Sequence, residues 1–415
     1  MPLKVVVVGA GLGGLGAAIA LTRAGHDVDV LEKSCFLNEV GAAIHVPPNA
    51  SRILTDWGCD LESLQPVRCN RLQVWDREGN LMRTSVVTQE VQEALGISDE
   101  WLLAHRVDLH NALRDVAATE VHGKRPTIHL CSRVVSVDPE AGEVILENGT
   151  RYTGDLIIGA DGSHSRCVSG VTDDCHHEST GQNCFRFLIP MQKMKSNPLT
   201  ASLLEKTGLD GTHIFTSNDR RIIFYPCRRG DLLNVAAFHP SGSEIASTDS
   251  ASLGPGDMSQ LLKTFDSFSP QLQEMCKMAE DLKLWSLACR TPPRTFIHGK
   301  LALIGDAAHP TLPHTGQGGA QALEDGAALG ALFTPATAKQ DIPQRLELYN
   351  QVRYARAITV MMMSRMSDER RGQMLDELKI YVPDAMFPEN MWFYTWNSYP
   401  ARDAQRLLQM TQAST

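Results

Sequence analysis

A glycine-rich turn near the N-terminus constrains the fold more than any other feature of this sequence. The segment Gly9-Ala10-Gly11-Leu12-Gly13-Gly14 follows a short β-branched run and precedes a helical pattern over 15–23. In such a turn, Gly9 permits the tight bend, Gly11 lets a pyrophosphate approach the backbone, and Gly14 lets the helix pack on the strand. A glycine turn with a purely structural role can have the same sequence. The neighbouring residues must therefore show whether this turn binds a nucleotide.

The residues after the turn supply that context. The helical pattern ends at Gly25, a second short strand covers 28–31, and Glu32 follows 18 residues after Gly14. A carboxylate at this place usually accepts a hydrogen bond from a ribose hydroxyl. The sequence therefore predicts a βαβ unit that binds a dinucleotide, without distinguishing FAD from NAD.

Further strand patterns extend this unit and predict a second module. Short apolar strands and one helix that belong with the dinucleotide-binding unit are expected at 127–130, 134–137, 144–147, 155–159, 301–304 and 318–332. Alternating strands around 72–84 and 181–238 predict an antiparallel sheet. The segment 241–256, rich in Ser, Gly, Pro and Asp, is expected to be a loop.

The fold class that follows is α/β with discontinuous domains. We expect a Rossmann-like dinucleotide-binding domain that is interleaved with a β-sheet substrate domain and followed by a helical C-terminal segment. The first domain is assigned to 1–70, 100–180 and 290–365, the second to 71–99 and 181–289, and the last segment to 366–415. A helix that packs its methionines against the body is expected over 361–366.

Composition narrows the classes of partner. The net charge of −9 disfavours nucleic acid and acidic membrane surfaces, both of which attract basic proteins. No stretch of apolar residues is long enough for a transmembrane helix, and no cysteine spacing is typical of a metal site. The ten dispersed cysteines are expected to be reduced thiols in a cytoplasmic protein.

Two further motifs distinguish between the dinucleotides. The first is Asp155-Leu156-Ile157-Ile158-Gly159-Ala160-Asp161-Gly162, and the second is Gly305-Asp306-Ala307-Ala308-His309-Pro310, which leads through Gly316-Gln317-Gly318-Gly319 into a helix. With the N-terminal glycine turn, in this order and at these distances, the chain resembles the aromatic hydroxylases among flavoprotein monooxygenases, the family of p-hydroxybenzoate and salicylate hydroxylases. The three motifs span nearly the whole chain.

The resemblance implies FAD as the bound cofactor. It assigns Asp306 to the ribityl chain and the helix that begins at Gly318 to the pyrimidine edge of the flavin, where its N–H groups and dipole stabilise negative charge. A carboxylate such as Asp306 at the end of a buried strand also requires donors that satisfy it. His309 is expected to shape its turn rather than to react. The full set of expected cofactor contacts is Gly9, Gly11, Leu12, Gly14, Glu32, Lys33, Ala43, Arg106, Val134, Asp161, Asp306, Gly316, Gly318 and Gly319.

The resemblance also implies the reaction. No second nucleotide-binding fingerprint is evident, so NADPH or NADH is expected to bind transiently at the flavin surface. Reduced flavin and O2 then form a C4a-hydroperoxide that attacks an electron-rich ring, with the protein providing position and dryness. The small residues of Gly41-Ala42-Ala43-Ile44-His45 would leave room for a flavin that moves.

The substrate contacts are expected on the β-sheet module. Arg186 and Tyr225 stand in apolar strands and resemble the arginine and tyrosine that hold a substrate oxyanion in fungal salicylate-hydroxylase-like and dearomatising enzymes. A cation lowers the pKa of a phenol, and a phenolate is the better nucleophile. A structural ion pair for Arg186 and a core position for Tyr225 are the alternatives. Pro313 and His314 are expected near the flavin face, where His314 either donates to substrate or caps the turn.

These observations leave several alternatives open. The main hypothesis is hydroxylation of a salicylate-like phenol, with loss of carboxylate or of aromaticity if the attacked carbon is substituted. A flavoprotein epoxidase that acts on an isoprenoid or alkaloid is the alternative, and a flavin-binding protein without turnover is a third. The aromatic segment 391–400 either covers the body or pairs with a second subunit in a homodimer.

Overall fold

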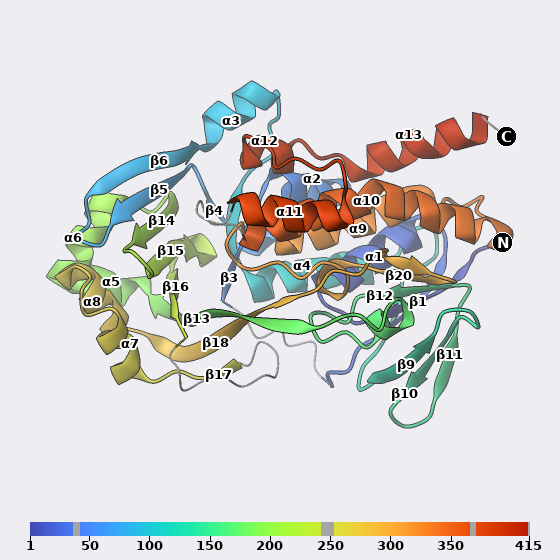
Figure 1. The fold of residues 1–415 in the computed structure, drawn as a ribbon, viewed down its shortest axis with the longest axis horizontal. Helices are drawn as coiled ribbons and strands as arrows, with labels where there is room; N and C mark the ends of the chain where they lie inside the picture. The colour runs from blue at the N-terminus through green and yellow to red at the C-terminus, as the bar shows by residue number, and fades with distance from the viewer. Residues whose placement is uncertain (36–41, 242–252, 366–370, 414–415) are drawn as a thin grey trace.

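The computed structural model describes residues 1–35, 42–241, 253–365 and 371–413 (Figure 1). Its strands form two large sheets and two small ones within this part of the chain. The six-stranded sheet has the order β19 (Ile297–His298), β20 (Leu301–Leu303), β12 (Leu156–Gly159), β1 (Lys4–Val8), β2 (Asp27–Leu31) and β8 (Thr127–His129). The pairs between β20 and β8 are parallel, so this is the nucleotide-binding sheet that the glycine turn predicts.

The eight-stranded sheet forms the other half of the molecule. Its order is β17 (Leu253–Pro255), β18 (Glu280–Arg290), β13 (His177–Pro190), β16 (Leu232–Pro240), β15 (Arg221–Cys227), β14 (Gly211–Thr216), β5 (Arg71–Asp76) and β6 (Leu81–Val87). Figure 1 shows the long strands β13 and β18 running from this sheet towards the six-stranded sheet. The two large sheets are thereby joined by continuous backbone.

The small sheets and the helices complete the architecture. One small sheet contains β11 (Arg151–Thr153), β10 (Glu143–Leu146) and β9 (Val134–Asp138), and the other contains β3 (Ala43–Val46), β7 (Leu102–His105) and β4 (Val67–Arg68). The helices are α1 (Leu12–Arg23), α2 (Pro48–Asp56), α3 (Thr88–Leu95), α4 (Arg106–Ala118), α5 (Met191–Ser196), α6 (Pro198–Thr207), α7 (Met258–Thr264), α8 (Pro270–Lys277), α9 (Gly318–Leu332), α10 (Ile342–Arg365), α11 (Arg371–Tyr381), α12 (Met391–Trp396) and α13 (Pro400–Ala413).

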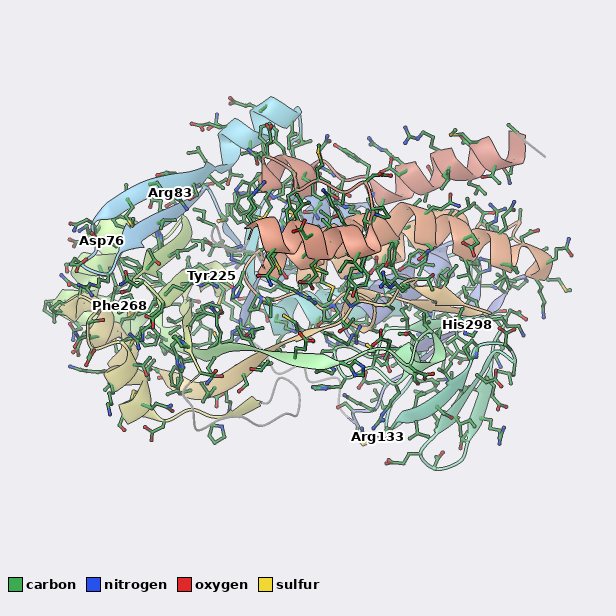
Figure 2. All side chains as sticks on the ribbon, viewed as in Figure 1. Asp76, Arg83, Arg133, Tyr225, Phe268 and His298 are labelled. Carbon is green, nitrogen blue, oxygen red and sulfur yellow. A yellow bond between two sulfur atoms is a disulfide. The ribbon has the colours of Figure 1, made fainter. Side chains whose placement is uncertain are left out.

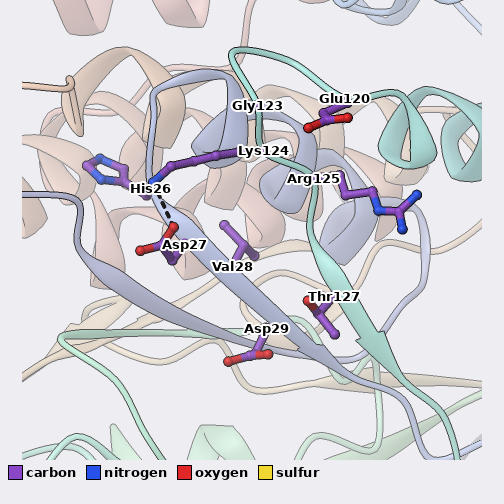
Figure 3. A pocket seen from close by; sticks show the side chains of 9 residues that line it. All are labelled: His26, Asp27, Val28, Asp29, Glu120, Gly123, Lys124, Arg125 and Thr127. Atoms are coloured by element: carbon purple, nitrogen blue, oxygen red, sulfur yellow. Dashed lines mark hydrogen bonds and ion pairs between the residues drawn. The ribbon is translucent and has the colours of Figure 1, made fainter.

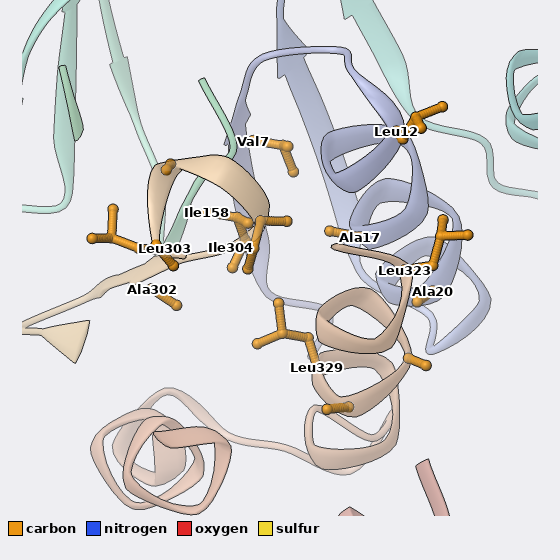
Figure 4. Close-up of a cluster of buried hydrophobic side chains, with 14 of the residues drawn as sticks. Val7, Leu12, Ala17, Ala20, Ile158, Ala302, Leu303, Ile304, Leu323 and Leu329 are labelled. Atoms are coloured by element: carbon orange, nitrogen blue, oxygen red, sulfur yellow. The ribbon is translucent and has the colours of Figure 1, made fainter. Parts of the chain in front are cut away.

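The main core lies between the six-stranded sheet and the helix pair α1 and α9 (Figure 4). Strand β1 is buried from Val5 to Val8, which explains its unbroken apolar sequence. The two helices approach closely because glycines face small residues: a Cβ on Gly330 would lie 2.7 Å from the Cβ of Ala20. At the other end of the pair, a Cβ on Gly13 would lie 3.3 Å from the Ala322 Cβ, so the first turns of α9 lie beside the glycine turn.

The structure confirms the α/β class and corrects several details of the expected elements. Helix α1 begins at Leu12 rather than at residue 15, because the glycine turn already has helical backbone at its end. The module expected to be antiparallel contains one parallel pair, β14 with β5. The expected loop over 241–256 contains β17, while 242–252 lie outside the described residues.

Parts of the methionine-rich segment and of the aromatic C-terminal segment are buried in the structure. Met361, Met362 and Met363 lie in the core on α10, as expected, whereas Met366 is outside the described residues. In α12, Trp396 is fully buried, so this part of the aromatic C-terminus covers the body of its own chain. Among the described helices, none has the length and apolar character that spanning a membrane requires.

Candidate active site

The glycine turn leaves bare backbone between β1 and α1. Gly9 has φ +100°, and a Cβ there would lie 2.5 Å from the carbonyl oxygen of Ala160. A Cβ on Gly14 would lie only 1.9 Å from the carbonyl oxygen of Gly9. Neither position has space for a side chain, so both require glycine, and a turn of this kind at the start of a helix is a common binding place for an anion.

Glu32 organises the backbone beside this turn. Its carboxylate accepts hydrogen bonds from the backbone N–H groups of Ala10 and Ser34, both at 2.8 Å. Lys33 is exposed, and Val134 is buried at the start of β9. Glu32 therefore lies next to the turn that the sequence assigned to the pyrophosphate.

Two cysteines near Glu32 contradict the expectation that all thiols are reduced. Cys35 and Cys131 form a disulfide, and the other eight cysteines are not disulfide-bonded. Sequence spacing gave no signal, because the partners are 96 residues apart and meet only when β8 pairs with β2. The bond joins the segments that follow these two strands.

Asp161 closes its own turn. Its carboxylate accepts hydrogen bonds from the Ser165 hydroxyl and the Arg166 N–H at 2.6 Å, and from the Cys167 N–H at 3.1 Å. The Cβ that Gly9 lacks would come within 3.1 Å of the Asp161 Cα. The second motif thus packs directly on the first and keeps its backbone in place.

Asp306 differs from the expectation in one respect. It lies on a short 3-10 turn, Gly305–Ala307, and its side chain is exposed rather than buried. The carboxylate therefore does not need a hydrogen-bond donor from the protein to offset a cost of burial. It lines the central cavity described below. Arg290 is fully buried behind it and donates to the carbonyl oxygens of Ser163 at 3.3 Å and Ala307 at 2.5 Å, which joins the second and third motifs.

Arg290 is a residue that sequence reasoning missed. It ends β18 within the segment Ala288-Cys289-Arg290-Thr291-Pro292. The sequence signal was weak, because β18 also contains Glu280, Asp281 and Lys283, so Arg290 is not the lone charge of an apolar strand.

The third motif ends at the start of α9, where the backbone is again uncovered. Gly316 has φ +64°, and a Cβ there would lie 3.3 Å from the His45 ring. A Cβ on Gly318 would lie 2.6 Å from the Thr311 hydroxyl. No side chain caps the N-terminus of α9, so its positive dipole end faces the cavity.

These elements enclose one cavity of about 430 Å³ between the sheets. Figure 2 shows Tyr225, one of its lining residues, in the interior of the molecule. The expected site residues that the cavity brings together are Ala43, Arg106, Arg186, Tyr225, Asp306, Pro313, His314, Gly316, Gly318 and Gly319. Those that do not line it are Gly9, Gly11, Leu12, Gly14, Glu32, Lys33, Val134 and Asp161. Gly41 lies outside the described residues.

One face of the eight-stranded sheet forms the cavity wall opposite α9. Strand pairing places its side chains in rows that cross the sheet. One row contains Tyr225 and Asn234, the next contains Arg186, Ala236 and Ile223, and the third contains Cys184, Phe238 and Arg221. Side chains two residues apart share a face, so alternation along three strands places Arg186 and Tyr225 on the same wall.

Arg186 and Tyr225 converge on one backbone carbonyl. The Arg186 Nη2 and the Tyr225 hydroxyl donate to the Ala43 carbonyl oxygen at 3.2 Å and 3.0 Å. The buried Asn234 accepts from the Ala43 N–H at 3.1 Å. Burial raises the pKa of Tyr225 well above its usual value, so the hydroxyl keeps its proton and remains a donor. Two hydrogen-bond donors are therefore directed at the same point of the cavity.

His45 was part of an expected loop, but its own role was missed. Its Nδ1 accepts a hydrogen bond from the Trp101 Nε1 at 3.1 Å, and its ring packs edge-on against Tyr225 with 4.6 Å between centroids. Burial lowers the pKa of His45 to about 4, so the ring is neutral at pH 7. A single histidine in a loop of small residues carries no sequence signal for this contact.

His314 contacts an arginine that the sequence analysis did not consider. The Arg221 Nη2 lies 2.6 Å from its Nδ1 and 3.1 Å from its Nε2. Burial, together with the nearby Arg221, lowers the pKa of His314 to about 3. The neutral ring can accept from Arg221 with one nitrogen, and the N–H of its other nitrogen can still donate a hydrogen bond.

His309 belongs to a buried charge network behind the cavity, in agreement with a structural role. Its Nε2 lies 2.7 Å from the Asp325 carboxylate, which also accepts from Arg353 at 2.7 Å. Arg353 pairs in addition with Glu324, and Glu324 accepts from Asn49 at 2.7 Å. The network therefore connects α9 and α10 with α2 beneath the start of α9.

A larger hollow lies away from these residues. It measures about 550 Å³ and lies on the outer side of β2, between that strand and the segment 120–127 (Figure 3). Lys124 reaches across it to Asp27 with an ion pair of 2.6 Å. None of the expected site residues lines it, so size alone does not identify the active site.

Comparison with known proteins agrees with this geometry. A family model described as "FAD binding domain" matches residues 2–364. The chain is 35% identical over 367 residues to hispidin-3-hydroxylase of Neonothopanus nambi, covering 86% of each protein. It is 34% identical over 394 residues to the FAD-dependent monooxygenase cfoG of Aspergillus candidus, covering 93% of this chain and 90% of that protein.

Solved structures share the fold. A salicylate hydroxylase in complex with substrate superposes with a TM-score of 0.76 at 24% sequence identity, covering 98% of each chain. The similarity in fold extends over both large sheets, because nearly the entire chain is covered.

Proposed function

Since this chain belongs to the FAD-binding family and is an FAD-dependent aromatic monooxygenase, we propose that it hydroxylates a phenol with O2 and with electrons from NADPH or NADH. The observation that carries the proposal is the pair of donors, Arg186 and Tyr225, directed at one point of the central cavity. A phenolic oxygen has the chemistry that such a pair binds.

The residues present fit a flavin. A flavin supplies electron transfer and activation of oxygen when bound, and both tasks require close approach of the protein backbone. At Gly14 and Gly318, a Cβ would collide with neighbouring atoms, and the N-cap residue of α9 makes no capping hydrogen bond with its side chain. We assign the pyrophosphate to the Gly9–Gly14 turn, the adenosine ribose to Glu32, the ribityl chain to Asp306 and the pyrimidine edge to the start of α9.

The substrate oxygen takes its place beside the two donors. A guanidinium stabilises the phenolate and lowers the pKa of a bound phenol, and the protonated Tyr225 adds a hydrogen bond to the same oxygen. In the structure, Arg186 and Tyr225 both donate to the Ala43 carbonyl oxygen. A substrate oxyanion must therefore replace this carbonyl as the acceptor of the two hydrogen bonds. The wall around them is apolar, which excludes water and strengthens the interaction.

The range of products depends on the attacked carbon. A ring carbon that bears hydrogen gives simple hydroxylation, whereas one that bears carboxylate or a carbon substituent leads to decarboxylation or to loss of aromaticity. The names of hispidin-3-hydroxylase and salicylate hydroxylase support a phenolic substrate. An isoprenoid epoxidase has no use for a donor pair at this place, so we favour the phenol.

The test compares Arg186→Ala with Arg83→Ala, whose side chain is exposed near the outer edge of the eight-stranded sheet (Figure 2). Reduced-nicotinamide oxidation is measured with salicylates, resorcinols and acylphenols, and with terpenes as the contrasting class. We expect phenols to stimulate oxidation in the wild type and in Arg83→Ala. Arg186→Ala should lose this stimulation by roughly 100-fold while it still binds FAD, because one charged hydrogen bond is removed from the reacting oxygen. Equal loss of flavin binding, or stimulation by terpenes alone, would contradict the proposal.

A further inference from the structure

Arg221 is a partly buried cation without a carboxylate partner among the described residues. It pairs with no acidic residue in the described part of the chain. Its Nη2 contacts His314, its Cζ lies 4.7 Å from the centroid of the Phe238 ring, and its buried Nε has no hydrogen-bond partner among the described residues. The nearby Cys184 is a neutral thiol, because burial raises its pKa to about 12. Withdrawing part of a charged group from water costs free energy unless an opposite charge or hydrogen bonds compensate it. The arrangement therefore lacks an anion.

A second cavity adjoins Arg221. It measures about 250 Å³ and shares Leu312 and His314 with the central cavity, so these two side chains form the wall between them. Arg221 lines the second cavity, as do Thr180 and Gln182 of β13. The two hollows are thus neighbours along one face of the same sheet.

The acidic groups of this second cavity do not neutralise Arg221. Glu377 pairs with Arg365 at 3.3 Å, and Arg365 also donates to the Arg290 carbonyl. Glu178 is exposed on β13. Arg221 is therefore the cation of this cavity that remains available to a ligand.

We propose that Arg221 and His314 form a second substrate-binding site, which accepts an anionic group, a carboxylate in the simplest case, on the part of the substrate remote from the reacting ring. The inference rests on the proposed function and specifies the substrate class, an extended phenolic acid. The phenol occupies the central cavity, and the acidic end reaches past Leu312 towards the second cavity.

The spacing along the sheet sets the length of such a substrate. Arg221 and Tyr225 stand on the same face of β15, four residues apart, which corresponds to about 13 Å between their Cα atoms at the usual rise of a strand. Arg186 lies in the row between them. A single benzoate is shorter than this span, whereas two linked rings with a phenol at one end and a carboxylate at the other approach it.

The test uses 4′-hydroxybiphenyl-4-carboxylate and its methyl ester as matched probes. Their dissociation constants are measured on the FAD-loaded enzyme from the change in flavin absorbance. The wild type should bind the acid more tightly than the ester by at least about tenfold, because only the acid compensates Arg221. Arg221→Gln should abolish this preference and leave the ester's constant within about threefold of the wild-type value. Arg220→Gln is the control, since the adjacent Arg220 pairs with Asp219 and does not line the second cavity.

The results of these binding measurements either support or overturn the proposed anion site at Arg221. Wild-type enzyme that does not distinguish acid from ester, or an acid preference that persists in Arg221→Gln, would overturn the inference. A variant in which only the KM for the reduced nicotinamide rises would assign Arg221 to the coenzyme's phosphates instead. Should Arg221→Gln fail to load FAD, the wild-type comparison still decides. If phenols stimulate turnover but the acid binds no more tightly than the ester, the second substrate-binding site is refuted and the proposed function stands. If no phenol is bound or oxidised, the proposed function itself fails.

Discussion

Replacing Gly14 by alanine tests the assignment of the pyrophosphate to the glycine turn. A Cβ on Gly14 would lie 1.9 Å from the Gly9 carbonyl oxygen, and real Cβ atoms do not come closer than about 3.0 Å to such an atom. Helix α1 must therefore move away from β1 by roughly an ångström.

That movement is opposed on the other side of the helix. A Cβ on Gly326 of α9 would already lie 2.9 Å from the Ala17 nitrogen of α1, so the two helices have no slack between them. Overpacking of this kind typically costs about 1–3 kcal/mol. The same shift displaces the N–H groups at the start of α1 from the pyrophosphate, and a loss of that size weakens FAD binding by roughly 10-fold to 100-fold.

The assay titrates the apoprotein with FAD and follows the quenching of flavin fluorescence, with thermal unfolding measured in parallel. Gly372→Ala is the matched control, because no atom lies within 4 Å of its Cβ position and the residue is in helix α11. This variant should bind FAD normally and gain up to about 1 kcal/mol of stability. Wild-type affinity in Gly14→Ala would refute the reasoning, since it would mean that the turn is not where the pyrophosphate binds.

Three further predictions concern the buried network and the cysteines. Arg353→Met should lower the free energy of unfolding by about 3–5 kcal/mol in denaturant titrations, because it leaves Glu324 and Asp325 less compensated in the core; a loss below 1 kcal/mol would contradict this. Burial raises the pKa of Glu324, but Arg356 and Arg353 outweigh burial and lower it to about 2 from its ordinary 4.5. Its contribution of roughly 3 kcal/mol is therefore present above pH 4.5 and lost as the pH falls towards 2, which acid unfolding of wild type and Glu324→Gln would reveal. Titration of the unfolded, unreduced chain with a thiol reagent should find eight thiols, whereas ten would exclude the Cys35–Cys131 disulfide.

The sequence predicted those parts of the molecule that local geometry dictates. The strand, glycine turn and helix at the N-terminus require glycine at set positions, and the helix that begins at Gly318 was predicted at its observed bounds. Alternation along apolar strands identified Arg186 and Tyr225 as polar exceptions, and both line the cavity. These features depend on neighbours within a few residues.

The remaining features depend on contacts between distant segments. The Cys35–Cys131 pairing, the parallel pair β5 and β14, and the contact between Arg221 and His314 each join residues far apart in the chain. Composition and periodicity do not encode such register. Asp306 shows the converse error, because it follows a buried strand yet is exposed to the cavity.

Turnover under 18O2 tests the central claim most directly. The FAD-loaded enzyme is supplied with reduced nicotinamide and the panel of phenols, and the products are analysed by mass spectrometry. The account predicts a phenolic product that carries one 18O atom for each reduced nicotinamide consumed in coupled turnover. Reduced nicotinamide consumed with the label found only in hydrogen peroxide, for every phenol tested, would contradict it.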